Sequence, residues 1–188
     1  ASFGLPPLAQ ATIVGFVGDG QRNLVARALA DAPAVAVEEG LAAMRREYAA
    51  GLLDATTLYP GVRETLTRLR AAGWLQAVAT NKPAPAAETI LRGLGVRELL
   101  DAVVGGGEEN LPLKPDPAPL RLAMTRAGWP GTGPAWMVGD HRTDLEAGRR
   151  AGLKRCFCRY GFGFPAQESW DLAVDDPRDF ARAAGVAV

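Results

Sequence analysis

Histidine, cysteine and lysine are scarce in this chain of 188 residues, and its charges cancel. There is one histidine, there are two cysteines, and 21 basic residues stand against 21 acidic ones. Cys156 and Cys158 lie one residue apart, which makes no disulfide framework and is typical of a protein from a reducing compartment. The zero net charge provides no overall attraction for nucleic acid or an anionic membrane. We therefore expect a cytoplasmic protein with no nucleic-acid partner and no membrane partner.

Long apolar runs are also lacking. No segment approaches the roughly 18 uninterrupted apolar residues that a membrane helix needs. No basic residue precedes Arg22, so the sequence shows no signal peptide. Hydrophobic residues nevertheless make up 48% of the chain, which is too many for a disordered protein. The length suits one ordinary domain, or a domain with a smaller lid. The oligomeric state stays open between a monomer and a homodimer.

The pattern of apolar residues changes near residue 59. Residues 8–58 have apolar residues at helical spacing and no convincing strand. From Pro60 onward, short apolar runs alternate with helical patterns, which predicts an α/β fold with a parallel sheet covered on both faces. We expect a helical cap subdomain over residues 1–59 and an α/β core over residues 60–188. The expected strands are Gln76–Thr80, Asp101–Val104, Ala135–Val138, Arg155–Cys158 and Leu172–Val174.

Two of the expected strands are followed by residues suited to binding an anion. Thr80 and Asn81 end the first strand, and Pro83 suits the opening turn of the next helix, whose free N–H groups attract anions. The same residues could instead form a helix cap without a ligand. Lys114 follows the second strand in a chain in which 18 of the 21 basic residues are arginine. A lysine there suggests a compact charge that binds phosphate, and a solvated loop lysine is the alternative.

A third strand end carries two carboxylates. The strand leads directly into Gly139 and Asp140, and Asp144 follows four residues later. Thr143 and Glu146 match a capping box, so we expect the next helix to begin at Thr143. Two carboxylates beside one helix N-terminus suit Mg²⁺, although they could serve only as helix caps. Together the three strand ends provide the residues that phosphoryl transfer requires.

These three segments resemble motifs of a known family. Thr80-Asn81-Lys82-Pro83, Lys114-Pro115-Asp116-Pro117 and Val138-Gly139-Asp140-His141-Arg142-Thr143-Asp144 are similar to the second, third and fourth motifs of the haloacid dehalogenase superfamily, in its phosphoglycolate phosphatase-like branch. The resemblance implies a Rossmann-like core with a helical cap. It also implies Mg²⁺ as cofactor and hydrolysis of a small phosphorylated metabolite through an aspartyl-phosphate.

The resemblance also implies roles for single residues. Thr80 and Lys114 would hold the transferring phosphoryl group, and Asn81 would line that site. Asp140 would ligate the metal, with Asp144 assisting it. The substrate-binding candidates are Lys82 in the core and Gly18, Asp19, Gly20 and Arg22 in the cap, where turn glycines and a solvated arginine are the alternative. His141 is expected to be an exposed loop residue, and the two cysteines are expected to be core thiols.

One motif of the family is missing from the sequence. A strand followed by Asp-x-Asp-Gly-Thr, which carries the nucleophile and the acid/base, does not occur in these residues. The segment Gly4–Leu8 resembles the stretch just after that motif. We expect that a strand, a turn and part of a helix, roughly 20–30 residues, precede Ala1 in the natural protein. The alternatives are a sugar-phosphate mutase and, if the chain truly starts at residue 1, a non-catalytic phosphate- or metal-binding module.

Overall fold

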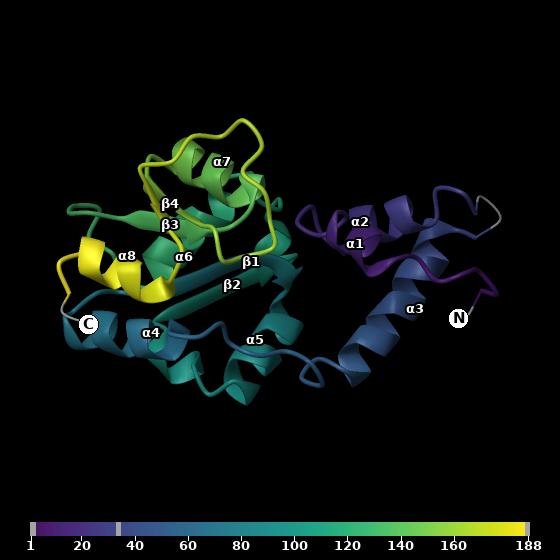
Figure 1. Cartoon of the computed structure of the whole chain (residues 1–188), viewed down its shortest axis with the longest axis horizontal. Coiled ribbons are helices and arrows are strands. Elements are labelled where there is room, and N and C mark those ends of the chain that lie inside the picture. The colour runs from purple at the N-terminus through teal and green to yellow at the C-terminus, as the bar shows by residue number, and fades with distance from the viewer. Residues whose placement is uncertain (1–2, 33–34, 187–188) are drawn as a thin grey trace.

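The computed structural model describes residues 3–32 and 35–186, which form a helical cap and an α/β core (Figure 1). The cap comprises α1 (Gln10–Val14), α2 (Gln21–Ala28) and α3 (Val37–Ala50), and α2 packs against α3. In Figure 1 it lies to the right of the core, next to the ends of β1 and β2. Within the described residues the cap contains no strand, as predicted. The outer limits expected for the two subdomains, residues 1 and 188, fall outside the described residues.

The core alternates strands and helices in the predicted order. Its helices and strands are α4 (Val62–Ala71), β1 (Ala77–Pro83), α5 (Ala84–Gly93), β2 (Ala102–Gly106), α6 (Ala118–Arg126), β3 (Trp136–Gly139), α7 (Arg142–Ala151), β4 (Lys154–Cys158), β5 (Leu172–Val174) and α8 (Pro177–Ala183), with short 3₁₀ turns η1 (Arg97–Leu99) and η2 (Glu108–Asn110). All strand pairs are parallel, which confirms the α/β class. Among the described residues, no helix has both the length and the apolar character needed to cross a bilayer.

The parallel strands form two sheets instead of one. β1 pairs with β2, and β3, β4 and β5 form a separate sheet with β4 in the middle. In the described residues, β1 and β3 each have a neighbour on one side only, and no ladder joins them. Helices α5 and α6 pack on the first sheet and α7 packs on β3 and β4. The contacts of α6 with α7 and of α4 with α8 connect the two halves of the core.

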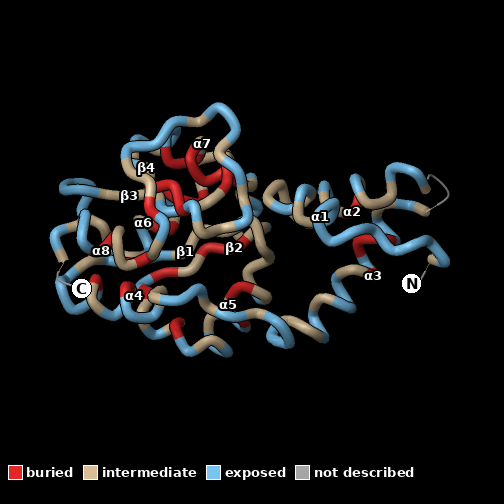
Figure 2. The backbone as a smooth tube through the Cα atoms, viewed as in Figure 1, coloured by how far each residue is buried: buried red, intermediate tan, exposed pale blue. Residues whose placement is uncertain are grey.

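Buried residues lie around both sheets and the helices that pack on them (Figure 2). Leu145 of α7 and Cys156 of β4 are completely buried. Cys156 and Cys158 are free thiols that pack with Leu69 and Phe180, which confirms the prediction of core thiols. Apolar side chains that leave water in this way provide most of the favourable free energy of folding.

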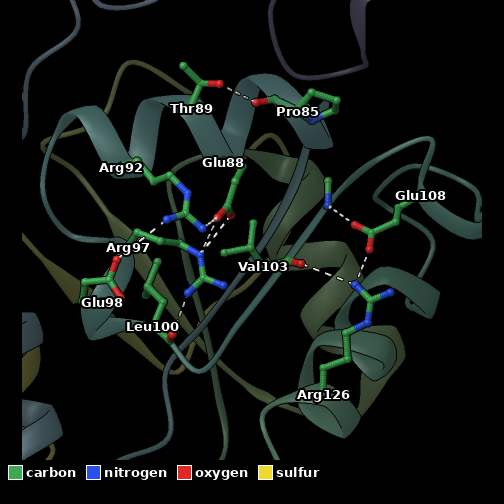
Figure 3. A network of polar contacts seen from close by, with 11 residues as sticks. Pro85, Glu88, Thr89, Arg92, Arg97, Glu98, Leu100, Val103, Glu108 and Arg126 are labelled. Atoms are coloured by element: carbon green, nitrogen blue, oxygen red, sulfur yellow. Dashed lines mark hydrogen bonds and ion pairs between the residues drawn. The ribbon is translucent and has the colours of Figure 1, made fainter.

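Two networks of polar contacts lie beside β2 and join neighbouring elements of the core (Figure 3). In the first, Arg97 donates to both oxygens of Glu88, at 3.0 and 2.9 Å, which joins η1 to α5. In the second, Glu108 accepts from the backbone N–H of Gly105 at 3.1 Å and also pairs with Arg126 of α6. The hydrogen bond from Arg126 holds the pKa of the Glu108 carboxyl below its usual range. The second network anchors the loop that leads from β2 to Lys114.

Candidate active site

A cavity of about 420 Å³ lies between the cap and the core, within the size range of small-molecule pockets. The core side comes from the ends of β1 and β3, from Lys114 and from the start of α7. The cap side comes from α1, α2, α3 and the loop before α2. The lining residues are Val14, Gly15, Val17, Gly18, Gly20, Gln21, Leu24, Met44, Tyr48, Thr80, Asn81, Lys82, Pro83, Lys114, Asp140, His141, Thr143, Asp144, Phe162, Gly163 and Phe164. The three strand ends singled out in the sequence therefore meet in one cavity.

Asn81 joins β1 to the Lys114 loop and to the cap. Its Nδ2 donates to the carbonyl oxygens of Gly18 and Lys114, both at 2.8 Å, and its Oδ1 accepts from the backbone N–H of Lys114 at 2.7 Å. These hydrogen bonds use both N–H donors of the side-chain amide and one acceptor position of its oxygen. Asn81 therefore lines the cavity as predicted, but its amide positions other groups. Thr80 beside it accepts from the backbone N–H of Lys82 at 3.2 Å, which leaves its own O–H free to donate.

Lys114 and Asp144 form a buried ion pair at the floor of the cavity. The Lys114 Nζ lies 2.6 Å from Asp144 Oδ1, and the two side chains are only 8% and 11% exposed. A buried ion pair needs further hydrogen bonds to offset the loss of water. The second oxygen of Asp144 supplies one, because it accepts from the backbone N–H of His141 at 3.1 Å.

Asp140 is held by the glycine-rich loop that follows β4. Its Oδ2 accepts from the backbone N–H of Gly163 at 2.8 Å. A Cβ on Gly161 would lie 2.3 Å from the Cβ of Asp140, so only glycine permits this close approach. The loop is fixed again where the backbone N–H of Arg142 donates to the carbonyl oxygen of Phe164 at 2.8 Å. Asp140 Oδ1 accepts no hydrogen bond from the residues that the structure describes.

The carboxylates of Asp140 and Asp144 fit a magnesium ion in part. Within the described ranges, no group of three or more His, Cys, Asp or Glu side chains is placed to hold a metal. Mg²⁺ is commonly bound by one or two carboxylates, with water and substrate phosphate completing its octahedron. Asp140 has a free oxygen for that purpose, whereas both oxygens of Asp144 already have partners in Lys114 and His141. The donor set therefore suits Mg²⁺ bound together with a phosphate group.

His141 is buried, so the expectation of an exposed loop residue is wrong. Its backbone is the N-cap of α7, which begins at Arg142 and not at Thr143, and its ring Nδ1 accepts from the backbone N–H of Thr143 at 3.3 Å. Asp144, and not Glu146, completes this capping box. The ring also packs edge-on against Phe164, with centroids 5.1 Å apart. Burial lowers the pKa of His141, although Asp144 partly opposes this shift.

The loop before α2 docks the cap onto the core. Asp19 Oδ2 lies 2.5 Å from Nη2 of Arg27 in the cap, and Asp19 Oδ1 lies 2.5 Å from Nη2 of Arg142 in α7. Gly18 has a φ of +121°, and a Cβ there would lie 2.5 Å from the His141 ring. Burial by itself would raise the pKa of Asp19, but the hydrogen bonds and charges of Arg27 and Arg142 outweigh it and hold the pKa below the usual range.

Similarity to known proteins shows which family this chain belongs to. Residues 2–152 match the profile of haloacid dehalogenase-like hydrolases. The chain belongs to this family. The plasmid phosphoglycolate phosphatase of Cupriavidus necator is 36% identical over 181 residues, which cover 93% of this chain and 78% of the relative. The phosphoglycolate phosphatase of Rhodospirillum rubrum is 38% identical over 186 residues, 94% of this chain and 76% of the relative.

A solved structure extends the likeness to the fold. The crystal structure of a predicted phosphoglycolate phosphatase from Haemophilus somnus superposes with a TM-score of 0.87 at 28% identity, over 97% of this chain and 85% of the other. These matches confirm the predicted superfamily and its phosphoglycolate phosphatase-like branch. The protein is a phosphatase.

The cavity of this haloacid dehalogenase-like hydrolase contains some of the predicted substrate-binding residues. Gly18, Gly20 and Lys82 line it. Asp19 does not, because its carboxylate is taken up by the two arginines. Arg22 is also outside the lining and forms an exposed ion pair with Glu38 at 2.7 Å. The structure thus separates the two charged cap candidates from the cavity wall.

Three aromatic side chains were not predicted as part of the site. Tyr48 of α3 lies on the same face as Met44, one turn earlier, and both line the cavity. The helical spacing of these two residues was visible in the sequence, but it did not say which partner the face meets. Phe162 and Phe164 lie at the rim, 61% and 50% exposed. The sequence signals there were the alternation with glycine in residues 161–164 and the likeness of Tyr160-Gly161-Phe162-Gly163 to the family.

Proposed function

We propose that this protein hydrolyses a small phosphorylated metabolite, phosphoglycolate or a close analogue, with the help of Mg²⁺ and through an aspartyl-phosphate. The observation that carries the proposal is the convergence of Thr80, Lys114, Asp140 and Asp144 on one cavity. Phosphoryl transfer needs little more than positioning and charge neutralisation, and these are the groups that provide both.

Thr80 and Lys114 are proposed to hold the phosphoryl group. The Thr80 hydroxyl oxygen accepts a hydrogen bond from the backbone N–H of Lys82, and its O–H can donate a hydrogen bond to a phosphoryl oxygen. The Lys114 ammonium has N–H donors beyond the one given to Asp144. Asn81 keeps the two groups in register, because it fixes both the backbone of Lys114 and the end of β1.

Asp140 is proposed as the main metal ligand. Mg²⁺ when bound would neutralise charge on the phosphoryl oxygens. Asp144 is proposed to assist by orienting Lys114 and the start of α7, since both of its oxygens have partners in the structure. Gly18, Gly20 and Lys82 are proposed to contact the substrate beyond its phosphate. Asp19 is proposed to hold the cap against the core through Arg142, whereas Arg22 pairs with Glu38 within the cap.

The nucleophile is proposed to enter on a further strand between β1 and β3. A second cavity of about 340 Å³ lies there, lined by Ala77 and Val78 of β1, by Trp136 and Val138 of β3 and by residues of α4 and α8. Thr65 Oγ1 and Gln76 Oε1 are buried in its wall without a hydrogen-bond partner. Buried polar atoms without partners are costly, so their presence supports an additional polar backbone in this position.

An aspartate at the end of such a strand would face the same cavity as Thr80 and Asp140, because parallel strands present their carboxyl ends at one edge. Its carboxylate would attack phosphorus and the P–O ester bond would break. The alcohol would leave with the ester oxygen, which would take a proton from the second aspartate of the Asp-x-Asp motif. Water would then cleave the acyl phosphate and release orthophosphate. Reading the gene upstream of the codon for Ala1 tests this: an Asp-x-Asp-Gly-Thr motif is expected, and its absence before a native start codon would exclude the proposed nucleophile.

The activity itself is tested on the protein encoded by the complete gene. Phosphate release from 4-nitrophenyl phosphate and from a panel of small phosphate esters is measured with Mg²⁺ and after removal of metal by EDTA. We expect Mg²⁺-dependent release with preference for phosphoglycolate. A protein that is inert towards the whole panel in the presence of Mg²⁺ would contradict the proposal. Formation of an isomeric sugar phosphate in place of orthophosphate would favour the mutase alternative.

A further inference from the structure

Lys82 and Tyr48 meet inside the cavity, one from the core and one from the cap. The Lys82 ammonium donates a hydrogen bond to the Tyr48 hydroxyl. It also lies over the Tyr48 ring, 4.6 Å from the centroid. Lys82 belongs to the end of β1 and Tyr48 to α3, and both side chains line the cavity.

This end of the cavity is rich in donors and carries an uncompensated charge. Tyr48 accepts a hydrogen bond from the Lys82 ammonium, and its own O–H has no acceptor among the described residues. Nor does any carboxylate in residues 3–32 and 35–186 form an ion pair with Lys82. Lys114, the other lysine of the cavity, is neutralised by Asp144. A half-buried cation with a neutral partner lacks the anion that normally offsets the loss of water.

The other contacts of the cap make a purely structural role for this pair unnecessary. The cap loop is already fixed by the hydrogen bond from Asn81 to Gly18 and by the ion pair of Asp19 with Arg142. An apolar side chain at either position would pack across the same boundary without bringing a charge into the cavity. The charge of Lys82 and the O–H of Tyr48 therefore need an explanation other than cap docking.

We propose that Lys82 and Tyr48 bind a second anionic group of the substrate, at the end away from the scissile phosphate. This rests on the proposed function and assigns two residues, Lys82 of the core and Tyr48 of the cap, to the carboxylate or second phosphate that distinguishes the substrate from a simple alkyl phosphate. A lysine ammonium is a compact charge that suits either anion, and the phenolic O–H adds a directed hydrogen bond. Because one donor belongs to the core and the other to the cap, the second anion bridges the two when it binds.

The test measures selectivity in the protein encoded by the complete gene. The probes are 2-phosphoglycolate, ethyl phosphate, which has the same length without the carboxylate, and ethylene glycol bisphosphate. The variants are Lys82→Met and Tyr48→Phe. The matched controls are Lys154→Met, whose ammonium lies over Trp136, and Tyr59→Phe, whose ring contacts Tyr160. Neither control residue lines the cavity.

We expect Lys82→Met to lower the ratio of kcat/KM for phosphoglycolate to that for ethyl phosphate by about 10- to 100-fold, the usual effect of a lost hydrogen bond to a charged group. Tyr48→Phe lowers the same ratio by roughly 3- to 10-fold, as for a neutral donor. The controls keep the wild-type ratio. A larger loss for the bisphosphate than for phosphoglycolate would assign the second anion as phosphate. Equal losses for all three esters in both variants would overturn the proposal and leave a structural contact.

A binding measurement separates this proposal from the proposed function. Calorimetric titration of wild type and Lys82→Met with phosphoglycolate and with ethyl phosphate needs no turnover. Tighter binding of phosphoglycolate that is lost in Lys82→Met supports the anion site even if no phosphate is released from any ester. Equal affinity of wild type for phosphoglycolate and ethyl phosphate would overturn the anion site even if both are hydrolysed.

Discussion

The side chain of Asn81 and the backbone of Lys114 hold each other by a reciprocal pair of hydrogen bonds. Asn81 Nδ2 donates to the Lys114 carbonyl oxygen at 2.8 Å, and the Lys114 N–H donates to Asn81 Oδ1 at 2.7 Å. This is the pattern that two paired backbone strands would use. A side chain here takes the place of a strand neighbour, and it fixes Lys114, the lysine proposed to bind phosphate, relative to the end of β1.

Asn81→Ala is expected to destabilise the protein, because it leaves both backbone groups of Lys114 without a partner. The cost is about 1–3 kcal/mol in the free energy of unfolding. Urea unfolding of wild type and variant measures it. Asn23→Ala is the control, since Asn23 also donates to a backbone carbonyl but is exposed. If Asn81→Ala costs no more than Asn23→Ala, the reciprocal pair does not fix the Lys114 loop.

Lys114 and Asp144 are expected to be strongly coupled. Lys114→Met or Asp144→Asn alone removes one partner of a buried pair and costs about 3–5 kcal/mol. The double variant is expected to recover much of this, because no buried charge is left alone. A double-mutant cycle of unfolding free energies gives the coupling. Additive losses would mean that the two charges do not stabilise one another in solution.

Asp140 is expected to control the response to Mg²⁺. In the protein encoded by the complete gene, Mg²⁺ with inorganic phosphate is expected to raise Tm. At a ligand concentration of 100 times Kd, the folded protein gains about 2.7 kcal/mol in the free energy of unfolding. Asp140→Asn removes this rise, whereas Asp175→Asn, at an exposed carboxylate that pairs with Arg159, retains it. Differential scanning fluorimetry, with EDTA to reverse the effect, measures both. A full Tm rise in Asp140→Asn would exclude this residue as the main ligand.

Asp19 is expected to make cap docking sensitive to acid. Its pKa is lowered in the folded protein, so its contribution is present above the usual Asp pKa of about 3.9 and is lost as the pH falls through the lower folded value. The Asp19→Asn variant is expected to lose less stability than wild type as the pH falls, because it has no carboxylate at this position to protonate. Urea midpoints between pH 6 and pH 3 are compared with those of Asp54→Asn, an exposed cap carboxylate. Parallel curves for wild type and Asp19→Asn would show that the two arginines add no acid sensitivity.

Much of the fold was predictable because its signals are local. The alternation of apolar runs with helical patterns predicted the strands and helices from Ala77 onward. The helical character of the cap was likewise visible. Local pattern also failed once: Thr143 and Glu146 looked like a capping box, but His141 and Asp144 form it.

The unpredicted parts of the site depend on contacts between distant segments. His141 is buried because Gly18 and Phe164 cover it, and neither contact has a signature in the sequence around it. Asn81 was predicted to line the site, but its engagement with Gly18 and Lys114 required the two loops to be placed. The role of Tyr48 likewise depends on how α3 is oriented over β1.

The division of the sheet has a consequence for how the site acquires its geometry. Thr80 and Asn81 stand at the end of one sheet, and Asp140 stands at the end of the other. The distance between the groups proposed to bind phosphate and the group proposed to bind the metal is therefore set at the seam between the two sheets, not within a single sheet. Whatever occupies that seam works as a spacer for the chemistry: a substitution of Val78 or Val138 along it would change the alignment of the two groups while leaving each sheet folded.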